Sequence, residues 1–122
     1  IIGLPGETKE TIKETINLAK KLPITFAIFH VASPYPGTDL YDEAKENNWL
    51  NLSHDLEKVD QGGISPVNYP NLSAEEVMVG IKKAYLSFYL RPTQAFRILK
   101  SIKNFSDLRH LSSIVLEHLV LK

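Results

Sequence analysis

The stretch of this chain that is most informative about chemistry is a glycine turn near its start, Gly-Leu-Pro-Gly-Glu-Thr at residues 3–8. It follows two β-branched residues and precedes a helical pattern, so we expect it to join a strand to a helix. Glycines in such a turn let the backbone approach a ligand closely, and the helix N-terminus offers free N–H groups. Two interpretations stay open, a ligand-binding loop and a plain turn whose glycines serve only the geometry. A Walker loop is excluded, because the spacing is too short and no Gly-Lys-Ser/Thr follows.

The histidines and cysteines argue against a metal site. The chain has no cysteine, which excludes disulfides, thiolate metal sites and cysteine-held iron–sulfur clusters within it. His110 and His118 are eight residues apart rather than four, and no His-Glu-x-x-His occurs. We therefore predict no metal ligand and no catalytic residue. Only His30, in an apolar stretch, is a candidate to face a ligand; the alternative is a core histidine bonded to a neighbour.

The first 48 residues are predicted to alternate between strands and helices. Thr8 is a suitable N-cap for a helix over residues 8–21, and Pro23 ends that helix. Residues 24–32 are nearly continuously apolar, which is typical of a parallel strand covered on both faces. Thr38 can cap a short helix to about residue 47. The pattern predicts strand, helix, strand, helix, with parallel strands and a right-handed crossover.

The remainder of the chain is predicted to be mainly helical. Residues 49–72 lack a sustained period and form an irregular connection. Ser73 and Glu76 make a capping box before a long helix, which Pro92 ends or kinks. Thr93 recaps a helix to about residue 104, and a last helix covers residues 106–120. The apolar face of the long helix consists of Val77, Ile81, Ala84, Tyr85, Phe88 and Tyr89.

Composition and charge set broad limits. The net charge is zero, but residues 1–76 carry 12 acids and 6 bases, whereas residues 77–122 carry 8 bases and 2 acids. A solvated helical surface explains this asymmetry, with contact to nucleic acid or an anionic membrane as the alternative. No apolar run is long enough to span a bilayer and no secretory signal is visible, so we expect a cytoplasmic protein. The opening Ile1-Ile2-Gly3, without an initiator methionine, leads us to expect a fragment of a longer protein.

Several of these segments, in their order, resemble one family. Residues 3–8, and Pro-Tyr-Pro-Gly-Thr-Asp-Leu-Tyr at residues 34–41, resemble the fifth and sixth strand regions of radical S-adenosylmethionine barrels. Leu-Ser-Ala-Glu-Glu at residues 72–76, leading to Phe-Tyr-Leu-Arg-Pro at residues 88–92, is similar to the tail of the cobalamin-binding branch. That branch includes methylases and the anaerobic oxidative cyclase of Mg-protoporphyrin monomethyl ester. The resemblance spans roughly residues 1–92, and residues 93–122 match no family pattern.

The resemblance implies an α/β fold, a partial (β/α) barrel fragment with two parallel strands followed by a mainly helical C-terminal extension. Its parts would be residues 1–48 as the C-terminal βαβα part of the barrel, residues 49–72 as the irregular connection and residues 73–122 as the helical extension. The implied cofactor-binding residues are Ile2, Gly3, Leu4, Glu7 and Pro34, with Glu7 holding the turn. The implied substrate-facing residues are His30, Ser33 and Tyr35.

The same resemblance implies that the parent protein is an oxidoreductase or methyltransferase that uses S-adenosylmethionine, an iron–sulfur cluster and cobalamin. The Cys-x-x-x-Cys-x-x-Cys motif for the cluster is absent here, so we expect this fragment alone to be inactive and to hold no cofactor. Its expected partners are an upstream barrel and cobalamin-binding domain of the same protein and a small-molecule substrate; no nucleic acid is expected. We also expect the exposed barrel edge to be covered by the helices after Ser73, with self-association completing the cover.

One alternative belongs to another class of function. Residues 73–122 would then form a helical module that docks a partner protein or an anionic membrane, without a catalytic role. A continuous basic face built from Arg91, Arg97, Lys100 and Lys103 would favour this alternative, whereas scattered charges would favour a structural tail.

Overall fold

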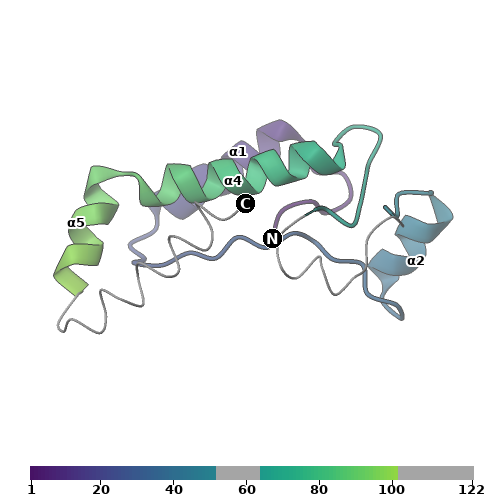
Figure 1. Cartoon of the computed structure of the whole chain (residues 1–122), viewed down its shortest axis with the longest axis horizontal. Helices are drawn as coiled ribbons and strands as arrows, with labels where there is room; N and C mark the ends of the chain where they lie inside the picture. The colour runs from purple at the N-terminus through teal and green to yellow at the C-terminus, as the bar shows by residue number, and fades with distance from the viewer. Residues whose placement is uncertain (52–63, 102–122) are drawn as a thin grey trace.

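The computed structural model describes residues 1–51 and 64–101 of the chain. Within these ranges it contains four helices, namely α1 (Lys9–Lys21), α2 (Asp39–Glu46), α4 (Ala74–Tyr89) and α5 (Pro92–Ser101). Helices α1 and α4 lie side by side, while α2 and α5 lie at opposite ends of the molecule (Figure 1). The last predicted helix, over residues 106–120, falls outside the described residues. None of the helices in the described part of the chain is long and apolar enough to cross a membrane.

The predicted fold class is wrong for the described residues, which are helical and contain neither a strand nor a barrel. Residues 1–2 and most of residues 24–32 are extended, but they meet only at one isolated parallel bridge between Ile2 and Val31. Ile2 N donates to His30 O at 2.8 Å, and Ala32 N donates to Ile2 O at 2.8 Å. A ladder would need further pairs on each side. None forms within the described residues, because Gly3, at φ 91°, turns the chain away directly after Ile2.

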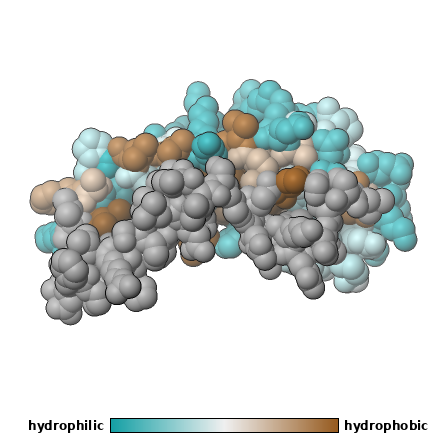
Figure 2. Space-filling model, viewed as in Figure 1, coloured by the Kyte–Doolittle hydropathy of each residue, from teal (hydrophilic) through white to brown (hydrophobic). Residues whose placement is uncertain are grey.

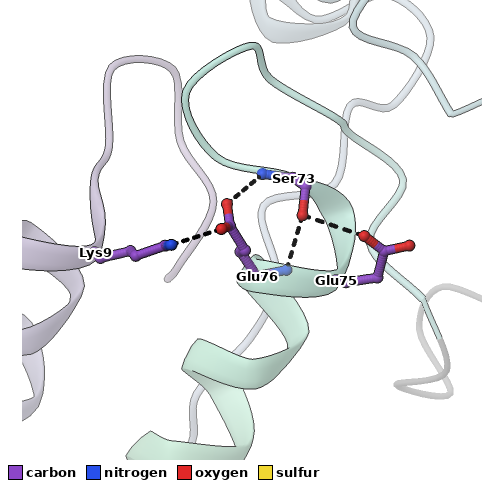
Figure 3. A network of polar contacts seen from close by, with 4 residues as sticks. All are labelled: Lys9, Ser73, Glu75 and Glu76. Carbon is purple, nitrogen blue, oxygen red and sulfur yellow. Dashed lines mark hydrogen bonds and ion pairs between the residues drawn. The ribbon is translucent and has the colours of Figure 1, made fainter.

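Three predicted helix starts, after the caps Thr8, Thr38 and Ser73, are confirmed, because local side chains fix them. The fourth is wrong, since α5 begins at Pro92 and includes Thr93 instead of being capped by it. The Thr8 side chain accepts from Thr11 N, and the Thr11 hydroxyl accepts from Thr8 N, which closes a capping box on α1. Thr38 caps α2. Ser73 and Glu76 form the predicted capping box on α4, and the Glu76 carboxylate also contacts Lys9 of α1 (Figure 3). Each box satisfies amide groups that the first helical turn leaves without an intrahelical partner.

The core lies between α1, α4 and the extended residues 24–32. Ile12 of α1 packs against Gly80 of α4, where an added Cβ would lie 3.2 Å from Ile12 Cγ2, and Ile16 is buried in the same core. Phe29 meets the ring of Tyr85 edge-on at 5.3 Å between centroids, and Phe88 is fully buried beside them. The predicted aromatic face of the long helix is therefore the face that packs inward. On the outside, apolar residues reach the surface in several separate patches (Figure 2).

Side chains of α4 and α5 bind the backbone of residues 24–29 where a neighbouring strand was expected. The Tyr85 hydroxyl contacts both N and O of Phe29, at 3.2 and 3.3 Å. The Tyr89 hydroxyl contacts both N and O of Ala27, at 3.1 and 2.9 Å. Gln94 Nε2 extends the same row by donating to the carbonyls of residues 24 and 25. Helical side chains thus satisfy one edge of this extended segment, since each polar backbone group that is buried needs a partner.

The ion pair between α1 and α4 makes stability depend on pH. Lys9 Nζ lies 2.6 Å from Glu76 Oε1. The hydrogen bond from Lys9, and then that from the Ser73 amide, lower the pKa of Glu76 below its usual value. A lowered carboxyl pKa adds stability above the pH at which free glutamate titrates, and this stability is lost as the pH falls through the lower folded value. We expect acidification to destabilise the wild type more than Glu76→Gln in thermal unfolding across the acid range. Glu14→Gln, on the exposed side of α1, should follow the wild type; equal pH profiles for all three chains would contradict this account.

Candidate functional site

The glycine turn is closed by contacts of its own residues. Gly3 and Gly6 have φ values of 91° and 77°, a left-handed region that glycine adopts without steric cost. Glu7 N donates to Leu4 O at 3.1 Å, and Gly3 N donates to the Glu7 carboxylate. Glu7 therefore holds the turn in the way that the sequence analysis expected. Its carboxylate binds the chain's own backbone in this structure.

Two residues of the irregular connection also fix this turn, and no motif in the sequence indicated either of them. The Tyr69 hydroxyl donates to Gly3 O at 2.8 Å, and Asn71 Nδ2 donates to Glu7 O at 3.0 Å. The Tyr69 ring packs edge-on against Trp49 at 5.1 Å. Burial, with smaller effects from the Glu43 and Glu7 carboxylates, raises the pKa of Tyr69 to about 12. Tyr69 consequently remains a hydrogen-bond donor to Gly3 throughout the neutral range.

Removing this hydroxyl should destabilise the turn. We expect Tyr69→Phe to lower the free energy of unfolding by roughly 1–3 kcal/mol, since the buried Gly3 carbonyl loses its donor. In the wild type the stabilisation by the Tyr69 hydroxyl is fully present below the pKa of free tyrosine. It is lost as the pH rises through about 12. Urea unfolding at neutral pH measures the first effect, and tyrosinate absorbance against pH measures the second. A Tyr69→Phe chain as stable as the wild type would show that the bond contributes nothing.

Beside the turn lies an open hollow of about 360 Å³ that collects four of the eight predicted site residues. Leu4 comes from the turn, and His30, Ser33 and Tyr35 come from the end of the second extended segment. The rest of its lining consists of Ile1, Val31, Ala32 and Leu40. Segments that are about 30 residues apart in the sequence thus meet at one surface, through the bridge between Ile2 and Val31.

The other four predicted residues do not line the hollow. Ile2 is fully buried in the core, and Pro34 is also buried. Gly3 is buried against α4, where an added Cβ would lie 3.1 Å from Val77 Cγ1. Glu7 is occupied with the Gly3 amide. Ile2, Gly3 and Glu7 hold the wall of the hollow in place through the bridge to Val31 and the closed turn.

The lining residues decide what the hollow can accept. No carboxylate, lysine or arginine is among them, and the only side-chain polar groups are those of His30, Ser33 and Tyr35. Ser33 Oγ donates to Val31 O at 3.4 Å, and His30 is exposed. Mainly apolar walls with a few polar groups are typical of small-molecule sites. Leu40 was not among the predicted site residues, although an apolar residue two positions after the Thr38 cap was an available signal.

The residues fit a small apolar or aromatic moiety, and they do not fit an iron–sulfur cluster. The chain contains no cysteine, so the usual thiolate ligands of a cluster are not among its residues. Over residues 1–51 and 64–101, no three histidine, aspartate or glutamate side chains come close enough to hold a metal ion.

The basic residues proposed for a membrane or partner face are partly engaged within the molecule. The Arg91 guanidinium donates to Lys20 O and lies over the Phe88 ring at 4.9 Å. Arg97 Nη1 donates to Ile24 O at 3.3 Å. Lys100 is exposed, and Lys103 lies outside the described residues. Arg91 and Arg97 therefore hold α5 and the end of α4 to the backbone, which favours a structural tail.

Sequence comparison places this chain beside parts of larger enzymes. It is 45% identical over 93 residues to an uncharacterised methyltransferase of Pyrococcus horikoshii, a match that covers 75% of this chain and 20% of that protein. It is 29% identical over 92 residues to the anaerobic magnesium-protoporphyrin IX monomethyl ester cyclase of Cereibacter sphaeroides, covering 75% of this chain and 14% of the cyclase. A shorter match, 44% identical over 46 residues, is to the tRNA-2-methylthio-N(6)-dimethylallyladenosine synthase of Corynebacterium diphtheriae and covers 38% of this chain and 9% of the synthase. No protein-family model and no solved structure matches the chain.

These matches confirm a partial similarity to radical S-adenosylmethionine enzymes over a short stretch of sequence. The chain spans only about a fifth, or less, of the length of the relatives that it matches. The two longer matches cover about as much of the chain as the resemblance noted in the sequence.

Proposed function

We propose that this chain is a section of a larger S-adenosylmethionine-dependent radical enzyme and forms one wall of its cofactor and substrate site. The observation that carries the proposal is the meeting of Leu4, His30, Ser33 and Tyr35 at one uncharged hollow. Similarity to a methyltransferase and to a cyclase supports it. The hollow's volume of about 360 Å³ lies in the range of small-molecule pockets.

Each part of the wall would have a separate task. Ile1 and Leu4 would contact the adenosine part of S-adenosylmethionine, and the turn held by Glu7 and Tyr69 would keep Leu4 in place. His30, Ser33 and Tyr35 would face the substrate. In such an enzyme S-adenosylmethionine, together with an iron–sulfur cluster, supplies the radical that starts the reaction. The cluster, and cobalamin if the enzyme uses it, would be held elsewhere in the longer protein, since this chain has no cysteine.

The exposed apolar residues indicate where the rest of that protein would pack. Phe26 is 50% exposed and Ile28 is 69% exposed, and neither lines the proposed ligand site. Leaving several large apolar side chains exposed to water is unfavourable in free energy. We infer that the remaining part of the same protein covers them and that the chain alone associates through them instead. Light scattering should show self-association that Phe26→Lys with Ile28→Lys abolishes. A wild-type chain that stays monomeric at high concentration would oppose the inference.

Ligand titration tests the proposed site. Amide chemical shifts of the isotope-labelled chain would be followed as S-adenosylmethionine is added, with adenosine as a second ligand. Because only one wall is present, we expect weak binding, with shift changes at Leu4, His30, Ser33 and Tyr35. Leu4→Arg should abolish the changes. Leu18→Arg, at an exposed leucine of α1, is the matched control and should leave them intact. Shift changes confined to other surfaces, or none at millimolar ligand, would refute the proposal.

A further inference from the structure

A second concave surface lies between α1 and α4 and plays no part in the proposed site. It encloses about 270 Å³. Its apolar lining consists of Ile12, Ile16, Val79 and Gly80. Ile12 and Ile16 are buried, whereas Val79 is 65% exposed in the middle of an otherwise well-packed helix. Gly80 brings the two helices close together, so the groove between them is shallow and open to side chains from outside.

The rim of this groove is predominantly basic. Lys9, Lys13 and Lys83 line it together with one carboxylate, that of Glu76. Lys9 and Glu76 neutralise each other across the groove at 2.6 Å (Figure 3). Lys13 and Lys83 are exposed and form no ion pair within the described residues. The groove therefore combines an apolar lining with two exposed lysines, one from each helix, that form no ion pair among the described residues.

We propose that the groove between α1 and α4 binds an acidic amphipathic helix of another protein. One bulky apolar side chain of that helix would lie over Ile16 and Val79, and its flanking carboxylates would pair with Lys13 and Lys83. The complementary charges give the binding its specificity and speed of association. This proposal is independent of the one made for the hollow.

The shape of the groove favours a helix over an extended peptide. Its walls are helix surfaces, whose backbone amides and carbonyls are used within α1 and α4, so no open edge is available for an added strand. A third helix can place its side-chain ridge between the ridges of two packed helices. The acidic helix of this chain, α2, is an unsuitable occupant in a second copy, because its Ala44 is buried and its Leu40 lines the other hollow.

Fluorescence anisotropy with designed peptides tests the proposal on the full chain. The probe is a labelled helical peptide with leucines at i, i+3, i+4 and i+7 and glutamates beside them. A matched peptide has lysine in place of each glutamate. We expect the acidic peptide to bind, the basic one not to bind, and added salt to weaken binding. Lys13→Glu with Lys83→Glu should weaken binding about tenfold or more, which two reversed charge pairs can account for.

Control variants separate this result from general charge effects. Lys21→Glu with Lys45→Glu changes the net charge equally at exposed positions outside the groove and should leave affinity unchanged. Val79→Asp should abolish binding while the circular dichroism spectrum stays helical. Equal binding of both peptides, equal loss in the control pair, or no binding by a folded chain would overturn the proposal. Tight binding to phosphatidylserine vesicles that displaces the peptide would also overturn it, in favour of a membrane surface.

Discussion

Replacing Phe88 with alanine is expected to lower the free energy of unfolding by about 3–5 kcal/mol, the range found for buried aromatic residues. Phe88 is fully buried and is the largest side chain in that state among the described residues. Its ring meets Phe29 at 6.2 Å and Tyr89 at 4.9 Å, and Arg91 lies over it. Truncation would leave a cavity at the point where α4, α5 and residues 24–29 come together. Since small domains are stable by only about 5–15 kcal/mol, much of the fold's stability would be lost.

Urea unfolding followed by circular dichroism measures this effect. Phe96→Ala is the matched control, because Phe96 lies on α5 and is 71% exposed. A surface substitution of that kind should change stability by no more than about 0.5 kcal/mol. Equal losses for the two variants would mean that Phe88 does not occupy the centre of the core.

The second large loss of stability is expected from the double substitution Tyr85→Phe with Tyr89→Phe. Each hydroxyl contacts both backbone groups of one residue, Phe29 and Ala27 respectively. Leaving a buried group unpaired costs about 1–3 kcal/mol, so the larger loss is expected at the buried Phe29 and the smaller at the partly buried Ala27. Burial is the main cause that raises the pKa of Tyr85, so the hydroxyl stays protonated and can donate at neutral pH. The extended segment should therefore loosen although the aromatic packing is retained.

Hydrogen exchange can locate this loss. The amides of Ala27 and Phe29 should exchange much faster in the double variant than in the wild type, while amides in the middle of α1 change less. Tyr41→Phe, on α2 and away from the segment, is the control and should leave both amides protected. Unchanged protection of Ala27 and Phe29 in the double variant would contradict the role given to the two hydroxyls.

The helices could be predicted because their signals are local. Thr8, Thr38 and Ser73 each cap a helix within one turn of their own position, and the apolar face of residues 77–89 repeats at helical spacing. The sequence suggested Glu76 as the reciprocal partner of Ser73, which the structure confirms. It did not suggest Thr11 as the partner of Thr8, because threonine is an unusual residue at that place in a capping box.

The strands could not be predicted correctly, because strand pairing depends on distant residues. Residues 24–32 have the composition of a strand covered on both faces, yet Phe29 is buried while Phe26 and Ile28 are exposed. Their backbone partners on one side are tyrosine hydroxyls about 60 residues away in the sequence. Neither the composition nor the periodicity of the sequence indicates that a helix side chain will take the place of a neighbouring strand.

Only part of the candidate site could be predicted, because some of its residues come together only through distant contacts. Leu4, His30, Ser33 and Tyr35 were identified by motif resemblance, and the structure places them around one hollow. Tyr69 and Asn71 hold the turn from an irregular segment without a motif, so only the folded structure identifies them. The ligand contacts of Leu4, His30, Ser33 and Tyr35 stay predictions.

The most direct test of the central claim is to detect proton contacts between S-adenosylmethionine and the chain by nuclear Overhauser spectroscopy. We predict contacts from the adenine and ribose protons to the side chains of Ile1 and Leu4, and their loss in Leu4→Arg. Contacts only to Val79 and Ile12 in the groove between α1 and α4, or none at saturating ligand, would contradict the assignment of the hollow as part of a cofactor site.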